Sequence, residues 1–235
     1  MERKTDLRNT ISHLLKTLNS KAVIFDLDGT LIDNNAFHLI AWKKYLENIG
    51  IDIAAADYRK NINGRTNKDA IEYIYKRKMT DEEAMVFALE KEAVYRELYA
   101  PSIKPVEGLL NLLDMLHRLD IPMAIATSGI QVNIDFMFDH IPIKQYFKVV
   151  VNSAHISMGK PDPEIYIKAA ELLNIPRGNC LAFEDAAVGV TSAKKAGMKV
   201  IALLTTQTKE ELAEADMIIE NFTHQNLTRF ASDKR

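Results

Sequence analysis

Short apolar runs alternate with helical patterns from residue 21 almost to the end of this 235-residue chain. Few polar residues interrupt these runs, which is typical of strands buried on both faces of a sheet. The segments between them repeat apolar residues at helical spacing, as at Leu109, Leu112 and Leu116. This alternation predicts an α/β fold with a Rossmann-like parallel sheet and helices on both of its faces. The predicted strands are 22–27, 122–126, 148–152, 179–183, 199–204 and 216–219.

The stretch between the first and second predicted strands departs from this alternation, because only helical patterns fill it. We therefore expect a small α-helical domain that is inserted after the first strand, and one continuous layered fold is the alternative. The helical patterns cover 36–49, 66–78 and 81–99, and the two connections to the core are 31–35 and 100–105. The expected division is 1–20 as an N-terminal helical extension, 21–33 with 103–235 as the Rossmann-like core, and 34–102 as the helical domain.

The N-terminal extension has the pattern of an amphipathic helix over residues 3–19. Apolar side chains recur on one face of that helix, which predicts that the face is buried. We expect it to pack on the core, and a contact between two copies of the chain is the alternative. The residues of the apolar face are Leu7, Ile11, Leu14, Leu15 and Leu18.

Composition excludes several classes of partner. The net charge is −2 with both signs interspersed, so no basic stripe points to nucleic acid or to a membrane, and we expect a small-molecule partner. No apolar run is long enough to cross a bilayer, and residues 1–6 lack a secretory signal. The single cysteine, Cys180, excludes an intrachain disulfide and reads as a buried thiol. We expect a cytoplasmic protein that is a monomer or a weak homodimer.

Polar side chains lie at or just beyond the ends of four of the predicted strands. They are Asp26 with Asp28, Thr127 with Ser128 and Gly129, Lys160, and Glu184 with Asp185. Ligands of an open parallel sheet bind at the carboxyl ends of its strands, so the fold would bring these side chains together. Each group alone is weak evidence, since an acidic pair, a turn or a loop lysine is common. One reaction, phosphoryl transfer, uses all four at once.

The chemistry of these residues suggests a role for each. The Asp26 carboxylate can attack phosphorus and form an aspartyl-phosphate. Asp28, two residues later on an extended chain, can protonate the leaving oxygen and then deprotonate the attacking water. Lys160 can place a charge on the phosphoryl oxygens, while the Thr127 hydroxyl and the Ser128 amide donate hydrogen bonds to them.

A magnesium ion is the expected cofactor, because it prefers oxygen ligands and retains some water. Asp26 and Asp185 can supply carboxylates, and Asp28 can supply a backbone carbonyl. Glu184 can bind the ion directly or through water. The ion would offset the repulsion between Asp26 and an incoming phosphate.

The four segments resemble the motifs of the haloacid dehalogenase superfamily. Asp26–Asp33, Asp-Leu-Asp-Gly-Thr-Leu-Ile-Asp, resembles the first motif, Thr127 the second, Lys160 the third and Glu184-Asp185 the fourth. The resemblance extends from residue 21 to about residue 221 and implies a core with a mobile cap domain. Dehalogenation is not expected, because dehalogenating members lack an aspartate at the position of Asp28.

Within that superfamily, the chain is most similar to the β-phosphoglucomutase-like branch, through His38, Trp42 and the turn Gly64-Arg65-Thr66 before Asn67. The resemblance implies that His38 acts on the acid/base aspartate and that Gly64, Arg65, Thr66 and Asn67 bind substrate. His38 could instead only close the contact between cap and core. The mutase pattern has a lysine at the position of Asn63 and an arginine at that of Asn67, so the turn looks more like that of a sugar-phosphate phosphatase.

We therefore predict a magnesium-dependent phosphatase that acts on a small phosphorylated metabolite, expected to be a sugar phosphate. A β-phosphoglucomutase and a pyrophosphate or nucleotide hydrolase are the alternatives within the branch. A non-catalytic phosphate-binding module is disfavoured, because the nucleophile, acid/base, lysine and metal residues are all present.

Overall fold

The computed structural model describes residues 2–47 and 49–232. Within these residues six parallel strands form one sheet in the order β3-β2-β1-β4-β5-β6. The chain builds outward from β1 to β3, then crosses back and builds outward from β4 to β6, so the order reverses between β1 and β4. Such a switch point is where open parallel sheets bind ligands. The strands are β1 (Ala22–Phe25), β2 (Met123–Ala126), β3 (Val149–Val151), β4 (Cys180–Glu184), β5 (Lys199–Leu203) and β6 (Met217–Ile219).

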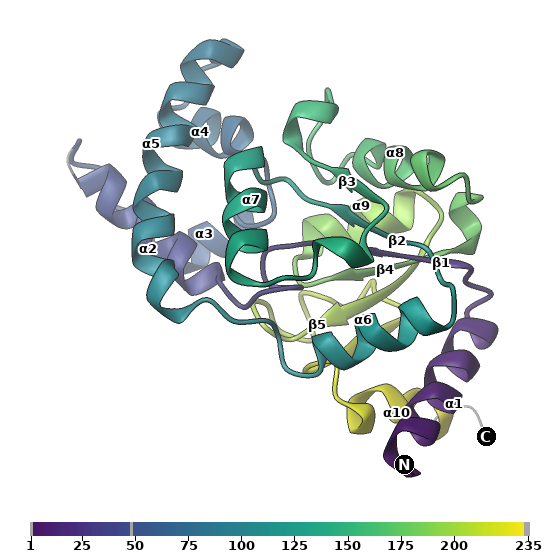
Figure 1. The fold of residues 1–235 in the computed structure, drawn as a ribbon. Coiled ribbons are helices and arrows are strands. Elements are labelled where there is room, and N and C mark those ends of the chain that lie inside the picture. Colours follow the sequence, from purple (N-terminus) through teal and green to yellow (C-terminus); the bar gives the residue numbers. More distant parts are fainter. Residues whose placement is uncertain (1, 48, 233–235) are drawn as a thin grey trace.

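Helices cover both faces of this sheet, as the apolar runs require (Figure 1). Alternate strand residues point to opposite faces, so Val23 and Phe25 join one apolar cluster while Ala22 and Ile24 join another. Phe25 stacks on Phe183 at 5.1 Å between ring centroids. The first cluster packs under α1 (Glu2–Thr17), α6 (Leu109–Arg118), α7 (Gln131–His140) and α10 (His224–Ser232), and the second under α8 (Glu164–Leu173) and α9 (Ala187–Lys195).

Helices α2 to α5, which follow β1, gather at one side of the sheet, and we call them the helical insertion (Figure 1). They have an apolar cluster of their own, centred on Trp42, Leu46 and Ile71. At its base, Ile32 forms an isolated antiparallel bridge with Pro105, so the two connections lie side by side. The insertion consists of α2 (Asn35–Glu47), α3 (Ala55–Asn61), α4 (Asn67–Tyr75) and α5 (Asp81–Tyr99).

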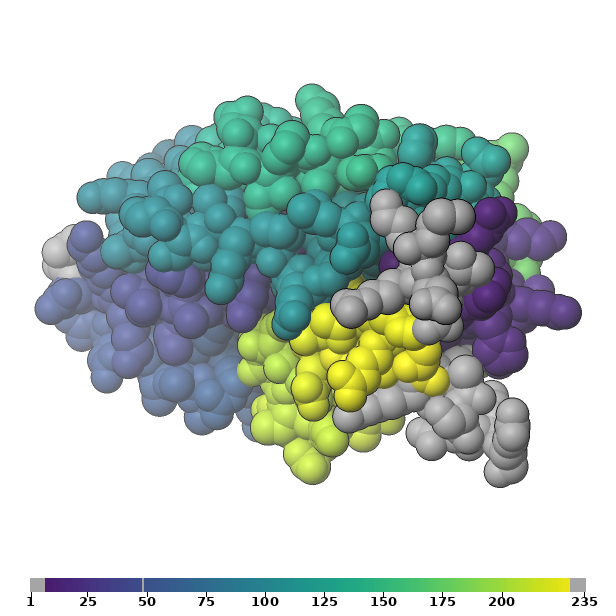
Figure 2. Space-filling view, turned by 60° about the horizontal axis from the view of Figure 1, so that its bottom comes forward, coloured from purple at the N-terminus to yellow at the C-terminus, as the bar shows by residue number. Residues whose placement is uncertain are grey.

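The N-terminal helix α1 is part of the core. Ile11, Leu14, Leu15 and Leu18 are buried in the cluster that lies under β1. The helix lies beside α10, which returns from the other end of the chain (Figures 1 and 2). The expectation that α1 packs on the core is therefore confirmed for the described residues.

The predicted strands are all present, with ends shifted by a residue or two. Helix α3 was not predicted, because its seven residues carry no clear apolar period. Helix α8 starts at Glu164, directly after Pro163. The Asp162 carboxylate accepts the Glu164 N–H at 2.9 Å. No helix in the described part of the chain is long and apolar enough to cross a membrane.

The burial of α1 makes a stability prediction. Leu14→Ala removes a side chain that is 3% exposed, so it should lower the free energy of unfolding by about 2–5 kcal/mol. Urea denaturation would measure the loss, with Leu172→Ala as the control because Leu172 is 61% exposed. A loss no larger than that of the control would mean that α1 does not stabilise the core.

Candidate active site

The ends of β1 and β4 bring the predicted site residues together at the switch point of the sheet. Asp26 directly follows β1, and its N–H donates to the Phe183 carbonyl at 2.9 Å, which continues the strand pairing by one residue. Glu184 is the last residue of β4, and Asp185 follows it. Asp26 is 6% exposed, and Glu184 and Asp185 are each 1% exposed. These carboxylates are therefore fixed and largely removed from water.

Lys160 joins two of these carboxylates. Its ammonium donates to Asp26 Oδ1 and to Glu184 Oε1, each at 2.6 Å, and it is 1% exposed. Burial alone would lower the pKa of Lys160, but the charges of Asp26 and Glu184 raise it above its usual value. Tyr166 on α8 donates a further hydrogen bond to Glu184 Oε1 at 2.7 Å. Lys160 is thus a buried cation, whereas its sequence context alone suggests an exposed loop residue.

Three carboxylates form a cluster that fits a divalent cation. One oxygen from each of Asp26, Glu184 and Asp185 lies within 4.8 Å of the others. Burial raises the pKa of Asp26 to about 8 against the opposing charge of Lys160, and burial with the charge of Glu184 raises that of Asp185 well above its usual range. One ammonium for three carboxylates leaves a surplus of negative charge. Hard oxygen ligands with such a surplus suit Mg²⁺.

Gly29 lets the chain turn close to this cluster. Its φ is +78°, and a Cβ placed there would lie 2.1 Å from Asp185 Oδ2 and 2.3 Å from Asn35 Nδ2. Any larger residue would both strain the turn and displace the Asp185 carboxylate. The glycine that follows Asp28 is therefore needed to hold this carboxylate in place.

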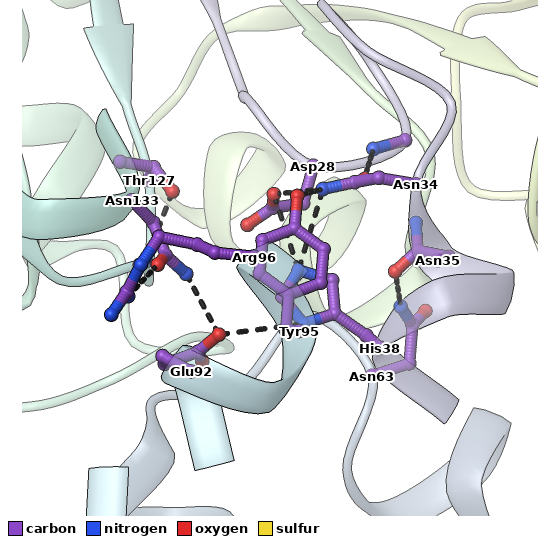
Figure 3. Close-up of polar contacts among 12 residues, drawn as sticks. Asp28, Asn34, Asn35, His38, Asn63, Glu92, Tyr95, Arg96, Thr127 and Asn133 are labelled. Atoms are coloured by element: carbon purple, nitrogen blue, oxygen red, sulfur yellow. Dashed lines mark hydrogen bonds and ion pairs between the residues drawn. The ribbon is translucent and has the colours of Figure 1, made fainter. Parts of the chain in front are cut away.

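Asp28 faces the helical insertion rather than the carboxylate cluster (Figure 3). Asn34 Nδ2 donates to Asp28 Oδ1 at 2.5 Å, and His38 Nε2 lies 3.4 Å from the same oxygen. Burial would raise the pKa of Asp28, but His38 and Asn34 outweigh it and hold the pKa below its usual range. His38 is 7% exposed and stacks on Tyr95 with ring centroids 3.8 Å apart.

The loop after β2 contributes hydrogen-bonding groups. The Gly129 N–H donates to Thr127 Oγ1 at 3.0 Å, so the Thr127 hydroxyl proton is left to donate to another group. Ser128 Oγ donates to the Gly64 carbonyl at 2.9 Å, which links this loop to the insertion. The side chain of Ser128 is thus engaged in a contact between the two parts of the molecule.

A cavity of about 60 Å³ lies between the core and the helical insertion. The core side presents the two aspartates and the loop after β2, and the insertion side presents both polar and apolar groups. Its volume is small beside the 300–1,000 Å³ that is usual for ligand pockets. The lining residues include Asp26, Asp28, Thr127, Ser128 and Gly129 from the core, and His38, Trp42, Ile62, Asn63, Gly64, Arg65, Asn67, Ala70, Lys91 and Glu92 from the insertion.

The turn between α3 and α4 supplies several of these residues. Gly64 has a φ of +75°, and a Cβ there would lie 2.8 Å from Val188, so the turn is pressed against the core. Arg65 has no side-chain hydrogen bond or ion pair with any residue that the structure describes. Thr66 does not line the cavity, because its hydroxyl caps α4 by accepting the Asp69 N–H at 3.1 Å. A substrate contact of Thr66 stays a prediction.

The family model that describes haloacid dehalogenase-like hydrolases matches residues 23–203, the greater part of the chain. The chain belongs to the haloacid dehalogenase-like hydrolase family.

Relatives of this haloacid dehalogenase-like hydrolase include a phosphatase and a mutase. It is 30% identical to the validoxylamine A 7'-phosphate phosphatase of Streptomyces hygroscopicus subsp. limoneus over 86% of the chain and 94% of the relative. It is 31% identical to the β-phosphoglucomutase of Bacillus subtilis over 76% of the chain and 80% of the relative. The crystal structure of a family IA variant 3 hydrolase from Entamoeba histolytica superposes with a TM-score of 0.77 at 32% identity, covering 91% of this chain and all of the other.

Two further residues of the site, Lys91 and Glu92, were not predicted from the sequence, and each is 2% exposed on α5. Glu92 Oε1 accepts from Lys91 Nζ at 2.6 Å and from Asn67 Nδ2 at 2.9 Å, while Oε2 accepts from Asn133 Nδ2 at 2.8 Å (Figure 3). Arg96 in turn donates to Asn133 Oδ1 at 2.8 Å. A signal was present, because this charged pair interrupts the buried face of α5, whose other members are Ala84, Ala88, Tyr95 and Tyr99.

The Lys91 ammonium also lies 3.2 Å from His38 Nδ1. An ammonium can only donate, so this contact makes Nδ1 the acceptor and leaves the ring proton on Nε2, facing Asp28. Asn34 and Asn35, at the start of the insertion, were also not predicted. They have no motif of their own, and only the fold shows that they reach Asp28 and Asp185.

The buried charge of Glu92 makes stability depend on pH. Burial would raise its pKa, but the charge of Lys91 and the hydrogen bonds from Lys91 and Asn133 lower it to about 2 from an ordinary 4.5. A pKa that is lower in the folded state adds stability above the unfolded value, and this is lost as the pH falls towards the folded value. Glu92→Gln should therefore cost about 3 kcal/mol near neutral pH and progressively less below about pH 4.5.

Urea denaturation of wild type and Glu92→Gln across pH 2–7 would measure this difference. Glu97→Gln, on the exposed side of the same helix, is the matched control and should show no such dependence. A cost for Glu92→Gln that stays constant with pH would contradict the ionic role of Glu92.

Proposed function

We propose that this protein is a magnesium-dependent phosphatase that hydrolyses a small sugar phosphate through an aspartyl-phosphate on Asp26. The observation that carries the proposal is the position of Asp26, which lines the cavity beside Asp28 while Lys160 and the carboxylate cluster lie at its other side. Membership of a hydrolase family and the phosphatase among the relatives support the same reaction class.

In the first step, a carboxylate oxygen of Asp26 attacks phosphorus and the bond to the leaving oxygen breaks. Lys160 holds Asp26 Oδ1 at 2.6 Å and so fixes the direction of attack. The Thr127 hydroxyl donates to a phosphoryl oxygen, because its own oxygen already accepts from Gly129. These contacts stabilise charge on the phosphoryl group without forming bonds to it.

Asp28 manages the proton in both steps. It gives a proton to the leaving oxygen in the first step and takes one from the attacking water in the second. Its pKa is low in the structure, and the negative charge of a bound phosphate would raise it. His38, with its proton on the nitrogen that faces Asp28, orients this carboxylate.

Asp26 and Asp185, with Glu184 and the Asp28 carbonyl, would hold Mg²⁺. When bound, the ion neutralises the surplus charge of the cluster and of the phosphate. Burial and neighbouring negative charge raise the pKa values of Asp26 and Asp185, and a bound cation would lower them again.

The insertion side of the cavity suits a polar leaving group. Arg65, with no partner among the described residues, is the cation that can bind an oxygen-rich or anionic part of the substrate. Trp42, Ile62 and Ala70 add an apolar wall. A sugar offers hydroxyls and an apolar ring face together, and this combination favours a sugar phosphate.

A β-phosphoglucomutase is the second candidate, because a mutase is among the relatives at 31% identity. A mutase must hold a bisphosphate and turn it round, which needs a strong second phosphate site. Asn63 and Asn67 donate instead to Asn35 and Glu92. Only Arg65 of that turn is then a cation available to a second phosphate, so hydrolysis is favoured.

The reaction is tested by phosphate release with Mg²⁺ across a panel of phosphate esters and pyrophosphate. Wild type should release phosphate quickly from one or a few sugar phosphates. Asp26→Asn should lower turnover by at least about 10³-fold while the far-ultraviolet circular dichroism stays unchanged, because it removes the nucleophile. Removal of Mg²⁺ with a chelator should abolish release.

Retained turnover in a folded Asp26→Asn variant would refute the nucleophile assignment. Conversion of β-glucose 1-phosphate to glucose 6-phosphate, followed in parallel, separates the two candidates. Little phosphate release with bisphosphate-stimulated isomerisation would establish the mutase instead.

Arg65 should select the substrate. Arg65→Ala should lower kcat/KM for the preferred ester by about tenfold or more, because a charge-assisted contact to the leaving group is lost. A generic aryl phosphate should be affected much less. Arg59→Ala, an exposed arginine on α3, is the matched control. Equal effects of Arg65→Ala on both esters would mean that Arg65 does not contact the leaving group.

A further inference from the structure

Two buried asparagines connect the helical insertion to the carboxylate cluster, and Figure 3 shows the contact between these two side chains. Asn63, in the turn after α3, donates from Nδ2 to Asn35 Oδ1 at 2.8 Å. Asn35, the first residue of α2, donates from Nδ2 to Asp185 Oδ2 at 2.9 Å. The three side chains are 4%, 6% and 1% exposed, so each hydrogen bond is largely shielded from water. We call this chain of contacts the amide relay.

The core holds both ends of the amide relay. Thr206, just after β5, accepts a second hydrogen bond from Asn35 Nδ2 at 2.7 Å. Gln207 donates to Asn63 Oδ1 at 3.3 Å, and its own Oε1 accepts the Ala187 N–H at 2.8 Å. Asn63 therefore takes up its position only when the turn of the insertion lies against the loop after β5.

Asn35 constrains how Asp185 can turn. The hydrogen bond from Asn35 fixes Oδ2, which sets the plane of the carboxylate and the direction of its other oxygen. Asn63 donates to Asn35 Oδ1 at 2.8 Å and the Tyr58 hydroxyl donates to it at 3.5 Å, so Asn63 makes the shorter of the two contacts that present the NH₂ group of Asn35 to Asp185. An amide that lost the Asn63 contact could rotate and present its oxygen to the carboxylate, which would repel it.

We propose that Asn63 and Asn35 are positioning residues that couple closure of the helical insertion to metal binding at Asp185. The proposal rests on the metal role given to Asp185 in the proposed function. Groups that orient a metal ligand commonly change metal affinity by 10- to 100-fold when they are removed. Coupling of this kind is reciprocal, so closure strengthens metal binding and the metal favours closure by the same factor.

A purely structural role would give a different result. Buried amides need hydrogen-bond partners, and Asn63 and Asn35 could simply satisfy each other. Loss of Asn63 would then lower stability and leave the metal affinity of the folded protein unchanged. Metal affinity therefore separates the two roles.

Mn²⁺ binding to the full chain, followed by electron paramagnetic resonance without any substrate, is the test. Asn35→Ala should weaken binding by about 10- to 100-fold. Asn63→Ala should weaken Mn²⁺ binding by at least about fivefold. The expected effect is smaller because Asn63 acts on Asp185 only through Asn35. Asn61→Ala is the matched control, because Asn61 contacts Asp57 and Tyr73 within the insertion, and it should leave affinity unchanged.

A second measurement reports closure directly. Trp42 is the only tryptophan of the chain and lines the cavity, so acrylamide quenching of its fluorescence follows the insertion. Mg²⁺ should protect Trp42 in wild type and not in Asn63→Ala. Asn63→Ser serves for both measurements where circular dichroism shows that Asn63→Ala is not folded.

The relay would be overturned if folded Asn63→Ala bound Mn²⁺ with wild-type affinity, or if Asn61→Ala weakened Mn²⁺ binding as much as Asn63→Ala. Mg²⁺ that leaves Trp42 quenching unchanged in wild type would overturn the coupling. A wild type that binds Mn²⁺ as expected but releases no phosphate would refute the proposed function and leave the relay standing. A wild type that binds no divalent ion would refute both.

Discussion

The ion pairs of Lys160 are the constraint on which the site depends. Three carboxylates are buried at the ends of β1 and β4, and burying a charge costs several kcal/mol unless a partner offsets it. Lys160 contacts Asp26 and Glu184 at 2.6 Å each and so satisfies two of them. Asp185 is left with amide contacts from Asn35, and its raised pKa expresses the remaining imbalance. The negative charge that Lys160 leaves is what the proposed magnesium ion would offset.

Part of the contact between core and insertion consists of polar hydrogen bonds, which bears on movement. Ser128 donates to Gly64, Asn133 to Glu92, and Gln207 to Asn63. Polar groups exchange such partners for water at a net cost of only about 1 kcal/mol each, whereas separating apolar surfaces has no such compensation. The insertion, by contrast, keeps its own apolar cluster around Trp42. An insertion with an apolar cluster of its own can stay folded while these polar contacts open, and Tyr95 and Tyr99 of α5 connect it to the cluster of the core.

The sequence predicted the core half of the site well and the insertion half poorly. Asp26, Thr127 and Glu184 lie at or directly after the ends of strands, and the geometry of a parallel sheet brings strand ends together without further information. Glu92 and Asn133 meet only because α5 and α7 pack side by side, and no local pattern encodes that packing. The same limit applies to Thr66. A threonine in a turn can contact a ligand or cap the next helix, and the local sequence does not decide between these roles.

The two asparagines of the insertion turn bear on the proposed preference for hydrolysis. At both positions the resemblance to the mutase called for a cation. Asn67 instead donates to Glu92, and Asn63 donates to Asn35, so both amides hold other parts of the site in place. Arg65 is left as the cation of the turn, which suits a substrate with one phosphate at Asp26 and a polar remainder. Residues outside the catalytic motifs can therefore influence the reaction, because they determine which charged groups of the cavity are available to the substrate.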